Sequence, residues 1–505
     1  MTLSYAALAE ENAQLHSVVT GQSSEISRQR QRIEQLEAML KEALHREYGA
    51  SSEQVPPEQA RLFDEVYEDD EIDEACERVQ VAGHTGKRRK QPRLSEDLPH
   101  IDIIHDLDEA DKVCAEHGCT LKPLGEEVSR KLHFKPAELH VERHIQKTYV
   151  CPECDGGIHT APKPPSLIPK SMATPSLLAW VAVSKFCDAL PLYRQSQIFA
   201  RLGAELNRTT LANWMIAVGE RIQPLVNLLW DRLQEQPVIH MDETPVQVLA
   251  EPGKAPQSKS FMWVSAAGPP GQGVALFHYD ASRSGKVAQD LLADTECALM
   301  TDGYEGYNRL SQKITRLGCW AHARRYFVRA QRQQPKGKTG GADQALAWIG
   351  KLYQVERQLK DKTPSERRKI RQAKALPILN QLRKWLDKTQ PRTAPTTPLG
   401  KAMGYLDKQW PRLIRYLEDG NYPIDNNRAE NAIRPFVIGR KNYLFSQSVR
   451  GVNANANLYS LIETAKAHGL DPHAYLIQVF EKLPTAASVE DFEALLPGQV
   501  NHGDR

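Results

Sequence analysis

The sequence predicts a multidomain α+β protein, because stretches of three different patterns follow one another along its 505 residues. Apolar residues recur in a heptad near the N-terminus, two pairs of cysteines follow a polar stretch, and strand-like alternating runs then mix with helical sequence. We expect six regions: a coiled coil at 1–47, an acidic then basic linker at 48–100, a small cysteine-containing domain at 101–165, a helical, helix-turn-helix-like region at 166–232, a mixed α/β domain at 236–447 with a helical insertion at about 331–420, and a C-terminal helical segment at 448–490.

Composition sets few limits on function. The 65 Lys and Arg against 63 Asp and Glu give a formal net charge of +2, which argues neither for nor against a nucleic-acid partner. The eight cysteines are mostly scattered and no secretory signal precedes them, so we expect a reduced, cytoplasmic protein. No run approaches the roughly 18 apolar residues that a membrane span needs, so we expect no membrane partner.

Residues 5–43 keep one heptad register. The two seam positions are filled by Tyr5, Asn12, Val19, Ile26, Ile33 and Leu40, and by Leu8, Leu15, Gln22, Gln29, Leu36 and Ala43. Such a seam favours a coiled coil that joins copies of the chain into a homo-oligomer, in which Asn12 would specify the pairing register. The alternative is an amphipathic helix that docks on its own chain.

Residues 48–100 are polar, with an acidic block between Asp64 and Glu77 followed by a basic cluster. The cluster consists of Lys87, Arg88, Arg89 and Lys90. Blocks like these are usually solvated linkers. Because basic side chains also attract phosphates, we expect a linker with DNA contact as a secondary role.

Two cysteine pairs, Cys114 with Cys119 and Cys151 with Cys154, are separated by about thirty residues, a separation within the range of zinc-binding modules. Four thiolates, or three with His117, can close a tetrahedral Zn²⁺ site that holds together a zinc-binding-like domain with little core of its own. The second pair has the usual two intervening residues, whereas the first has four. The alternative is a set of incidental reduced cysteines.

The region 172–232 has a helical pattern. Within it, one helix, a turn with Gly203 and a second helix starting near Thr209 match a helix-turn-helix pattern. Arg208, Thr209, Thr210 and Asn213 would lead the second helix into a DNA major groove. Ordinary helical packing is the alternative, because any helix pair with a glycine turn gives the same pattern.

An acidic pair interrupts the apolar, strand-like run at 237–248. Alternation places His240 and Asp242 on one face of that strand and Met241 and Glu243 on the other. An isolated buried charge is very costly, so a carboxylate in such a strand needs a partner. That partner could be a cation.

Two further acids occupy similar positions. Asp302 ends the short apolar run at 298–301 before a glycine turn, and Glu430 lies in a helix that opens near Asn427. Asp, Asp and Glu supply the hard oxygen ligands that Mg²⁺ prefers. Two such ions can activate an attacking oxygen and stabilise a leaving one in an in-line phosphoryl displacement.

The residues around Glu430 leave two roles open. Asn427 and Glu430 fit a capping box, in which the glutamate bonds back to the cap amide. The same turn also gathers Asn427, Glu430, Asn431 and Arg434 on one polar face, which suits a metal and phosphate site. We expect Pro435 to end or kink this helix.

Four motifs carry a resemblance to a known family. They are His-Met-Asp-Glu-Thr-Pro at 240–245, Thr-Asp-Gly-Tyr-Glu-Gly-Tyr at 301–307, Cys-Trp-Ala-His-Ala-Arg-Arg-Tyr-Phe at 319–327, and Asp-Asn-Asn-Arg-Ala-Glu-Asn-Ala-Ile-Arg-Pro-Phe at 425–436. With these motifs the chain resembles the DDE transposases of the bacterial insertion-sequence-sixty-six family over nearly its whole length. The resemblance implies an RNase H-like (retroviral-integrase-like) catalytic core interrupted by a helical insertion.

The resemblance also implies a chemistry. Asp242, Asp302 and Glu430 would be the catalytic residues and would bind two Mg²⁺ ions, for which Mn²⁺ can substitute. The chain would cleave double-stranded DNA at terminal inverted repeats and transfer the strand into target DNA, in the bacterial cytoplasm and at the nucleoid. Small accessory proteins of the same element would be further partners. Family members carry a tighter first cysteine pair than Cys114 and Cys119.

We expect further DNA contacts from residues near the three acids. They are His322, Arg324, Arg325, Arg428, Arg434, Arg440 and Lys441. For Cys319 and His322 we expect a structural or DNA-positioning role rather than metal ligation. The basic run Arg367–Arg371 could hold flanking DNA, although a charge run is more often a solvated face.

Two other functions stay open. A DNA-binding regulator without catalysis would use the same coiled coil, zinc-binding-like domain and helix-turn-helix, and would need no metal at the three acids. An RNase H-like nuclease would cleave DNA without joining it.

Overall fold

The computed structural model describes residues 16, 18–23, 25, 26, 29, 138–150, 158–293, 295–334 and 339–499. The described residues of the expected coiled coil are helical and exposed. Both cysteine pairs and the basic cluster at 87–90 lie outside the described residues. The elements from residue 148 onward belong to one compact unit. Within the described ranges, no helix has the length and apolar character needed to cross a membrane.

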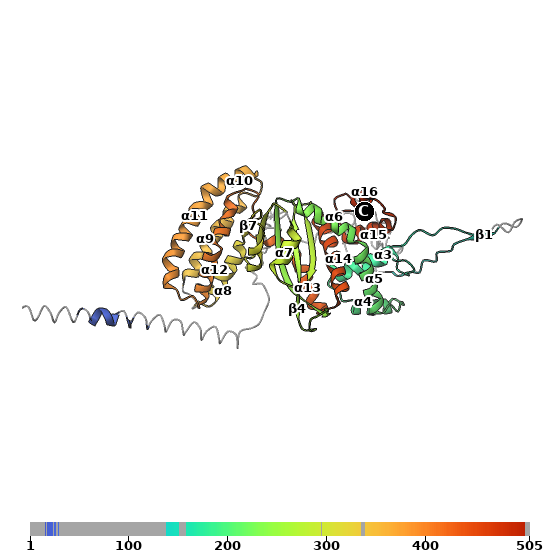
Figure 1. The fold of residues 1–505 in the computed structure, drawn as a ribbon, viewed down its shortest axis with the longest axis horizontal. Helices are drawn as coiled ribbons and strands as arrows, with labels where there is room; N and C mark the ends of the chain where they lie inside the picture. The colour runs from blue at the N-terminus through green and yellow to red at the C-terminus, as the bar shows by residue number, and fades with distance from the viewer. Residues whose placement is uncertain are drawn as a thin grey trace, which may run out of the picture. The chain divides into compact units, whose positions relative to one another are not determined.

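A six-stranded mixed sheet carries two of the three acids (Figure 1). Its strands are β3 (Val238–Ala250), β4 (Lys259–Ala267), β5 (Val274–Asp280), β6 (Ala298–Thr301), β7 (Thr315–Gly318) and β8 (Ser446–Ser448). The order is β5-β4-β3-β6-β7, and β8 pairs with the far end of β3. Strands β3, β4 and β5 are antiparallel neighbours, whereas β6 and β7 run parallel to β3. These three strands form a continuous antiparallel run that begins with the Asp242 strand.

Strand β3 is an inner strand of the sheet, with a hydrogen-bonded neighbour on each side. Ile239 and Met241 are fully buried in the main core, as the apolar run in the sequence predicts. Helix α7 (Gly285–Leu292) then leads from β5 to β6.

Helix α14 (Val449–Ala467) covers the edge of the sheet at β5 (Figure 1). The Ser460 hydroxyl accepts a hydrogen bond of 2.8 Å from the Phe277 amide, and the Thr464 hydroxyl accepts one of 3.1 Å from the Ala275 amide. These hydroxyls take the place of a further strand, so the edge offers no free ladder for pairing with another chain. We expected a C-terminal helical segment here, and its first helix is part of the main core.

Four helices precede the sheet: α3 (Pro175–Phe186), α4 (Leu192–Arg201), α5 (Arg208–Arg221) and α6 (Gln223–Gln234). Gly203 makes the turn between α4 and α5 with a φ of 86°. Asn207 then caps α5, because its side chain accepts a 2.8 Å hydrogen bond from the Thr210 amide. A helix pair with a glycine turn is confirmed at the expected place, and the second helix starts one residue before Thr209.

Helix α5 packs closely on α14. A Cβ atom on Gly219 would lie 2.5 Å from the Cβ of Ala454, so only glycine allows the two helices to approach this far. The helices α15 (Pro472–Lys482) and α16 (Val489–Glu493) complete the C-terminal part. The pair α4–α5 is therefore attached to the same core as the sheet.

The sequence between the second aspartate and the glutamate is helical, as expected. Its helices are α8 (Trp320–Arg332), α9 (Gly341–Arg357), α10 (Pro364–Ile370), α11 (Leu376–Thr389) and α12 (Pro398–Leu413), with a π-helical turn at Arg371–Ala375. They enclose a hydrophobic core of their own, which includes Leu352, Leu379 and Leu386. Helix α12 lies beside β7, at the opposite edge of the sheet from α14 (Figure 1).

The structure corrects one expected DNA contact in this insertion. The Arg371 side chain is 3% exposed. Its guanidinium donates to the Glu356 carboxylate at 2.9 and 2.7 Å and to the carbonyls of Tyr416, Asp419 and Tyr422. All of its described partners are inside the protein, so Arg371 stabilises the insertion and cannot reach DNA.

Two short strands lie before the helices. β1 (Thr148–Val150) pairs antiparallel with β2 (Ile158–Thr160). They flank residues 151–157, and this stretch contains the second cysteine pair.

Candidate active site

Asp242 lies in β3, and Asp302 directly follows the neighbouring strand β6. In the parallel pair of β3 and β6, His240 is opposite Met300, and each aspartate lies two residues beyond its member of that pair. Neighbouring strands are about 4.8 Å apart, and in-register residues point to the same face. The expected meeting of these two acids is supported by the strand register.

The environment of Asp242 disfavours its charge. Burial raises the pKa of Asp242 well above its ordinary value, and the negative charges of Glu243, Glu430 and Asp302 raise it further. Among the described residues, the Asp242 carboxylate accepts a hydrogen bond of 2.9 Å from the neighbouring Glu243 amide. Asp242 is therefore an acid without a cationic partner among the described side chains, beside two other acids.

The loop after β6 fixes Asp302. The Tyr304 amide donates a 2.8 Å hydrogen bond to the Asp302 carboxylate, and Gly303 makes the turn between them with a φ of 96°. From the insertion, the Tyr405 hydroxyl donates a 2.5 Å hydrogen bond to the Asp302 carbonyl. The carboxylate of Asp302 keeps a second oxygen for another ligand.

Glu430 is not a capping residue. Helix α13 (Asn427–Tyr443) has Asn426 as its N-cap, with no side-chain cap hydrogen bond, and Glu430 is its fourth residue. The Glu430 carboxylate instead accepts a 2.6 Å hydrogen bond from Arg325 of α8. The capping interpretation is wrong. Of the two effects expected of Pro435, an end or a kink of the helix, the end is wrong, because α13 continues to Tyr443.

His322 lies beside the same carboxylate. Its Nδ1 atom is 3.3 Å from Glu430 Oε1, but the two atoms do not have hydrogen-bond geometry and both are buried. Burial holds the pKa of His322 below its ordinary value. Glu430 Oε1 thus lacks a hydrogen-bond donor in the described structure and is the oxygen available to a cation.

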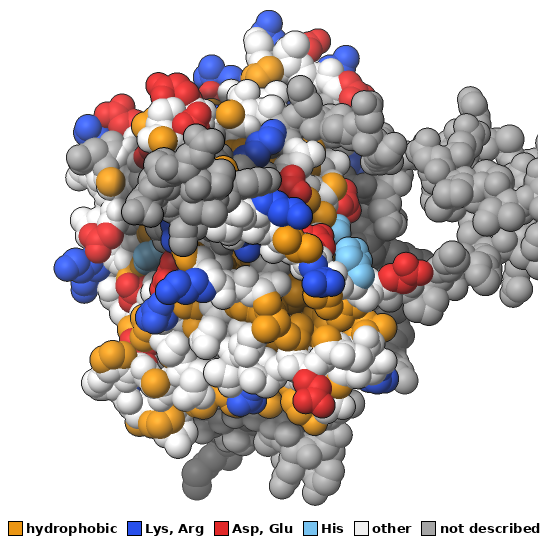
Figure 2. All heavy atoms as spheres, turned by 90° about the vertical axis from the view of Figure 1, so that its right-hand side faces the viewer, with side chains coloured by type: hydrophobic (Ala, Val, Ile, Leu, Met, Phe, Trp, Pro, Cys, Tyr) orange, Lys and Arg blue, Asp and Glu red, His pale blue; other side chains and the backbone are white. Residues whose placement is uncertain are grey.

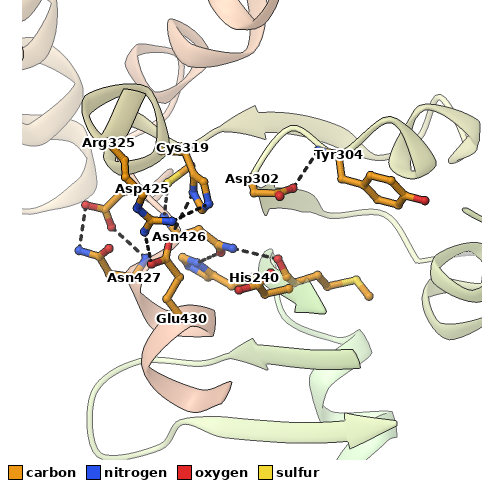
Figure 3. A network of polar contacts seen from close by, with 12 residues as sticks. His240, Asp302, Tyr304, Cys319, Arg325, Asp425, Asn426, Asn427 and Glu430 are labelled. Atoms are coloured by element: carbon orange, nitrogen blue, oxygen red, sulfur yellow. Dashed lines mark hydrogen bonds and ion pairs between the residues drawn. The ribbon is translucent and has the colours of Figure 1, made fainter. Parts of the chain in front are cut away.

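Asn426 holds the start of α13 against the sheet (Figure 3). Its amide nitrogen donates to the Met241 carbonyl at 2.9 Å, and its oxygen lies 3.1 Å from Nδ1 of His240. Burial lowers the pKa of His240 to about 3, so the ring is neutral and donates through Nδ1. These bonds place the helix of Glu430 next to the strand of Asp242.

Cys319 also contacts the start of α13. Its sulfur accepts a 3.2 Å hydrogen bond from the Asn426 amide. Sulfur of Cys319, one ring nitrogen of His322 and one oxygen of Glu430 lie within 4.8 Å of one another. Burial raises the pKa of the Cys319 thiol well above its ordinary value, so the protonated form is favoured. This accords with the structural role expected for the cysteine.

Asp425, just before α13, is bonded to the helical insertion. Its carboxylate accepts a 2.9 Å hydrogen bond from the Tyr353 hydroxyl of α9. Burial raises the pKa of Asp425 to about 6. Sequence reasoning gave no role to Asp425, Asn426 or Tyr405, because each acts through a partner that is far away in the chain.

Glu243 belongs to a different network. Its carboxylate accepts hydrogen bonds from Arg283 and, at 2.7 Å, from the Tyr307 hydroxyl. Its side chain is 1% exposed. The alternation in the sequence therefore separated the two neighbouring acids as predicted, and Glu243 is fully engaged within the protein.

The residues expected to contact DNA fall into two groups. Arg208, Thr209 and Asn213 are exposed at the start of α5, and Arg434 and Lys441 are exposed on α13. On the face shown in Figure 2, basic and acidic side chains are interspersed. No field of one sign covers that face, so recognition there would depend on individual residues.

The second group has partners inside the protein. Arg325 pairs with Glu430, Arg428 donates to the Gly268 carbonyl, and Arg440 donates to the Thr244 hydroxyl at 3.0 Å and to the Pro245 carbonyl. Burial lowers the pKa of Arg324. These side chains line or support the junction of α13, α8 and the sheet.

Four family models match successive parts of the chain. They are described as zinc-finger binding domain of transposase IS66 at 111–155, Transposase IS66 family at 170–454, IS66 C-terminal element at 460–497, and Transposase C of IS166 homeodomain at 35–103. The second of these covers the sheet, the insertion and all three acids. A transposase with DNA-binding domains is therefore indicated by sequence matches along most of the chain.

Two uncharacterized relatives also match most of the chain. The uncharacterized protein y4jD of Sinorhizobium fredii (strain NBRC 101917 / NGR234) is 33% identical over 440 residues, covering 83% of this chain and 84% of the relative. The uncharacterized protein y4qI of the same organism is 29% identical over 519 residues, covering 97% of this chain and 95% of the relative. From these matches and the site geometry, the chain belongs to the transposase IS66 family.

Proposed function

We propose that this transposase cleaves DNA at the terminal inverted repeats of its element and joins the cut strand to target DNA, using an RNase H-like DDE domain. The strand order supports the fold assignment. An RNase H-like core is expected to have three antiparallel strands, then two strands parallel to the first, and then a helix with a glutamate. The strands β3 to β7 and helix α13 follow this order. The family match at 170–454 supports the activity.

We propose further that Asp242, Asp302 and Glu430 hold two Mg²⁺ ions. The observation that carries this proposal is the placement of Asp242 in β3 beside the end of β6, which Asp302 follows, together with a buried Glu430 oxygen that lacks a hydrogen-bond donor. The charges of Glu430 and Asp302 contribute to the raised pKa of Asp242. A buried acid beside two others is costly unless a cation offsets the charge, and carboxylate oxygens are the ligands that Mg²⁺ prefers. When bound, such a pair of ions activates the attacking oxygen and stabilises the leaving oxygen.

The chain's own residues prepare this site. Asn426 and Cys319 fix the start of α13, and Arg325 and His322 border the Glu430 carboxylate. In the first reaction, water forms a bond to phosphorus at the element end while the bond from phosphorus to the 3′-oxygen breaks. In the second, the freed 3′-hydroxyl attacks a target phosphate and a target 3′-oxygen leaves. In each exchange one P–O bond forms and one breaks, the attacking oxygen loses a proton, and the leaving 3′-oxygen gains one.

One observation favours a second candidate, a DNA-binding regulator without catalysis. The Glu430 carboxylate is paired with Arg325 at 2.6 Å, and this cation occupies the place beside Glu430 Oε2. If that pair persisted with DNA and Mg²⁺ present, the trio would be incomplete. The chain would then bind element ends and leave them intact.

A cleavage and joining assay separates these functions. Full-length protein, labelled oligonucleotides that end in the element's terminal repeat, a supercoiled target plasmid and Mg²⁺ are combined, with Asp242→Asn and Glu430→Gln as variants. We expect joined product from the wild type only, with end binding kept in all three. Binding without cleavage by the wild type would establish the regulator, and cleavage without joining would establish a nuclease.

Two proposals concern the N-terminal half. The family match at 111–155 supports a structural Zn²⁺ held by Cys114, Cys119, Cys151 and Cys154. Metal analysis should find about one Zn²⁺ per chain, and a folded, zinc-free protein would refute the site. The heptad seam supports a homo-oligomer, which light scattering tests: removal of residues 1–47 should lower the mass of the assembly, and an unchanged mass would refute the coiled coil.

A further inference from the structure

Helix α12 of the insertion runs along the loop that carries Asp302. Besides the bond from the Tyr405 hydroxyl to the Asp302 carbonyl at 2.5 Å, the Gln409 amide donates to the Gly303 carbonyl at 3.4 Å. Further along, Lys408 pairs with Glu305, and Arg412 donates to the Asn308 side chain at 2.8 Å. One face of a single helix therefore contacts the loop repeatedly between residues 302 and 308.

The loop depends on this support because the sheet ends before it. Strand β6 has four residues and its ladder with β7 stops at Thr301. The carbonyls of Asp302 and Gly303 therefore have no strand partner, and an unpaired polar group of the backbone is costly when buried. Tyr405 and Gln409 supply the missing donors. Since a peptide unit is planar, holding these two carbonyls fixes the backbone from which the Asp302 side chain projects.

The helix holds these donors firmly. The Tyr405 ring stacks on Tyr326 of α8 with the ring centroids 4.5 Å apart. Gln409 is 2% exposed, and its oxygen accepts a 2.9 Å hydrogen bond from Arg412. A Cβ atom on Gly303 would lie 2.9 Å from the Gln409 amide, so the loop is in close contact with the helix.

We propose that helix α12 positions Asp302 for metal binding, with Tyr405 and Gln409 as positioning residues. This inference rests on the proposed function, because it assumes that Asp302 is a metal ligand. It gives the insertion a role inside the active site, beyond any contact with flanking DNA. Side chains that orient a metal ligand typically change metal affinity when they are replaced, even though they do not touch the ion.

The test measures Mn²⁺ binding to the full-length protein, from the electron paramagnetic resonance signal of the free ion, in parallel with thermal unfolding. Tyr405→Phe removes the hydroxyl and keeps the stacked ring, and Gln409→Met removes the amide donor at similar size. The matched control is Tyr416→Phe. The Tyr416 hydroxyl is buried in the same helical insertion and has no hydrogen-bond partner among the described residues. Asp302→Asn removes the proposed metal ligand and tests whether the Mn²⁺ signal comes from this site.

We expect Tyr405→Phe to raise the Mn²⁺ dissociation constant about tenfold. Gln409→Met should change it in the same direction, and Tyr416→Phe should leave it unchanged. A purely structural role for Tyr405 would lower the unfolding midpoint without changing the dissociation constant, and that result overturns the inference. Asp302→Asn should abolish the binding. If it does not, the proposed function fails as well, so the two failures are distinguishable.

Discussion

Arg283 donates two hydrogen bonds to Glu243, of 2.9 Å from Nε and 2.6 Å from Nη2, both to one carboxylate oxygen. Among the described side chains, the neighbouring acid Asp242 has no such cation. Two adjacent acids in one strand therefore have opposite environments, since Glu243 is paired with Arg283 inside the protein and Asp242 is not. Replacing each acid by its amide therefore gives two variants with different expected effects on stability and cleavage.

Glu243→Gln should weaken a network of charge-assisted hydrogen bonds and lower the free energy of unfolding by about 1–2 kcal/mol. DNA cleavage should persist at a temperature where the variant is folded, because Glu243 does not face the cluster. Asp242→Asn should abolish cleavage without that loss of stability. Chemical unfolding and the cleavage assay check both variants, and loss of cleavage in folded Glu243→Gln would show that the assignment of the two acids is incorrect.

The stability of the metal-free protein should fall as pH rises. Because burial and nearby acids raise the pKa of Asp242 above its ordinary 3.8, the folded chain holds this proton more tightly than the unfolded chain. Its stabilising contribution is complete below that ordinary value and is lost as pH rises through the folded-state pKa.

Asp242→Asn removes this dependence. In urea unfolding without divalent ions, the stability of the variant relative to the wild type should grow as pH rises from about 3.8 through the folded-state pKa of Asp242. Addition of Mg²⁺ should narrow the gap at high pH by stabilising the wild type. A gap that is constant over this range would contradict the electrostatic description of the site.

Asn426→Ala should be costly despite its small change in volume. The substitution leaves the Met241 carbonyl and the His240 ring unpaired in a fully buried place, so we expect a loss of about 2–3 kcal/mol in the free energy of unfolding. Cleavage should be lost as well, since α13 is released from the sheet. Asn421→Ala is the control, because Asn421 is exposed and its side chain makes no hydrogen bond in the described structure. Equal stability of the two variants would contradict the role of Asn426 in holding α13 against the sheet.

The exposed start of α5 gives a prediction for DNA recognition. Arg208→Ala should weaken binding to the terminal repeat by about 1–3 kcal/mol. Arg221→Ala is the matched control, since Arg221 is exposed at the other end of the same helix. Electrophoretic mobility shifts at fixed salt measure both. If the two variants bind equally well, α4 and α5 are ordinary packing helices, the alternative that the sequence leaves open.

Much of this fold was predictable from the sequence because local residue patterns indicate its strands, helices and turns. Alternation in β3 placed Asp242 and Glu243 on opposite faces, and the glycine at 203 marked the turn before α5. The role of Glu430 was harder to read. Helix α13 starts at Asn427, so Glu430 is at the fourth helical position and not at the third, where a capping box needs it.

The parts that sequence could not supply depend on contacts between distant residues. Asn426 meets Met241 and Tyr405 meets Asp302 across more than a hundred residues, and no periodicity reports such a contact. The expectation that α13 ends at Pro435 was wrong for a related reason. Ile433 and Phe436, on either side of it, are buried in the main core, and this packing keeps the helix continuous through the proline.

Anomalous diffraction from crystals of the full-length protein with Mn²⁺ and a DNA end tests the central claim most directly. We expect Mn²⁺ peaks that are coordinated by the carboxylates of Asp242, Asp302 and Glu430, with Glu430 turned away from Arg325. Peaks that contact only the two aspartates, with Glu430 still paired to Arg325, would contradict the three-acid site. So would Mn²⁺ bound elsewhere and no peak between these residues.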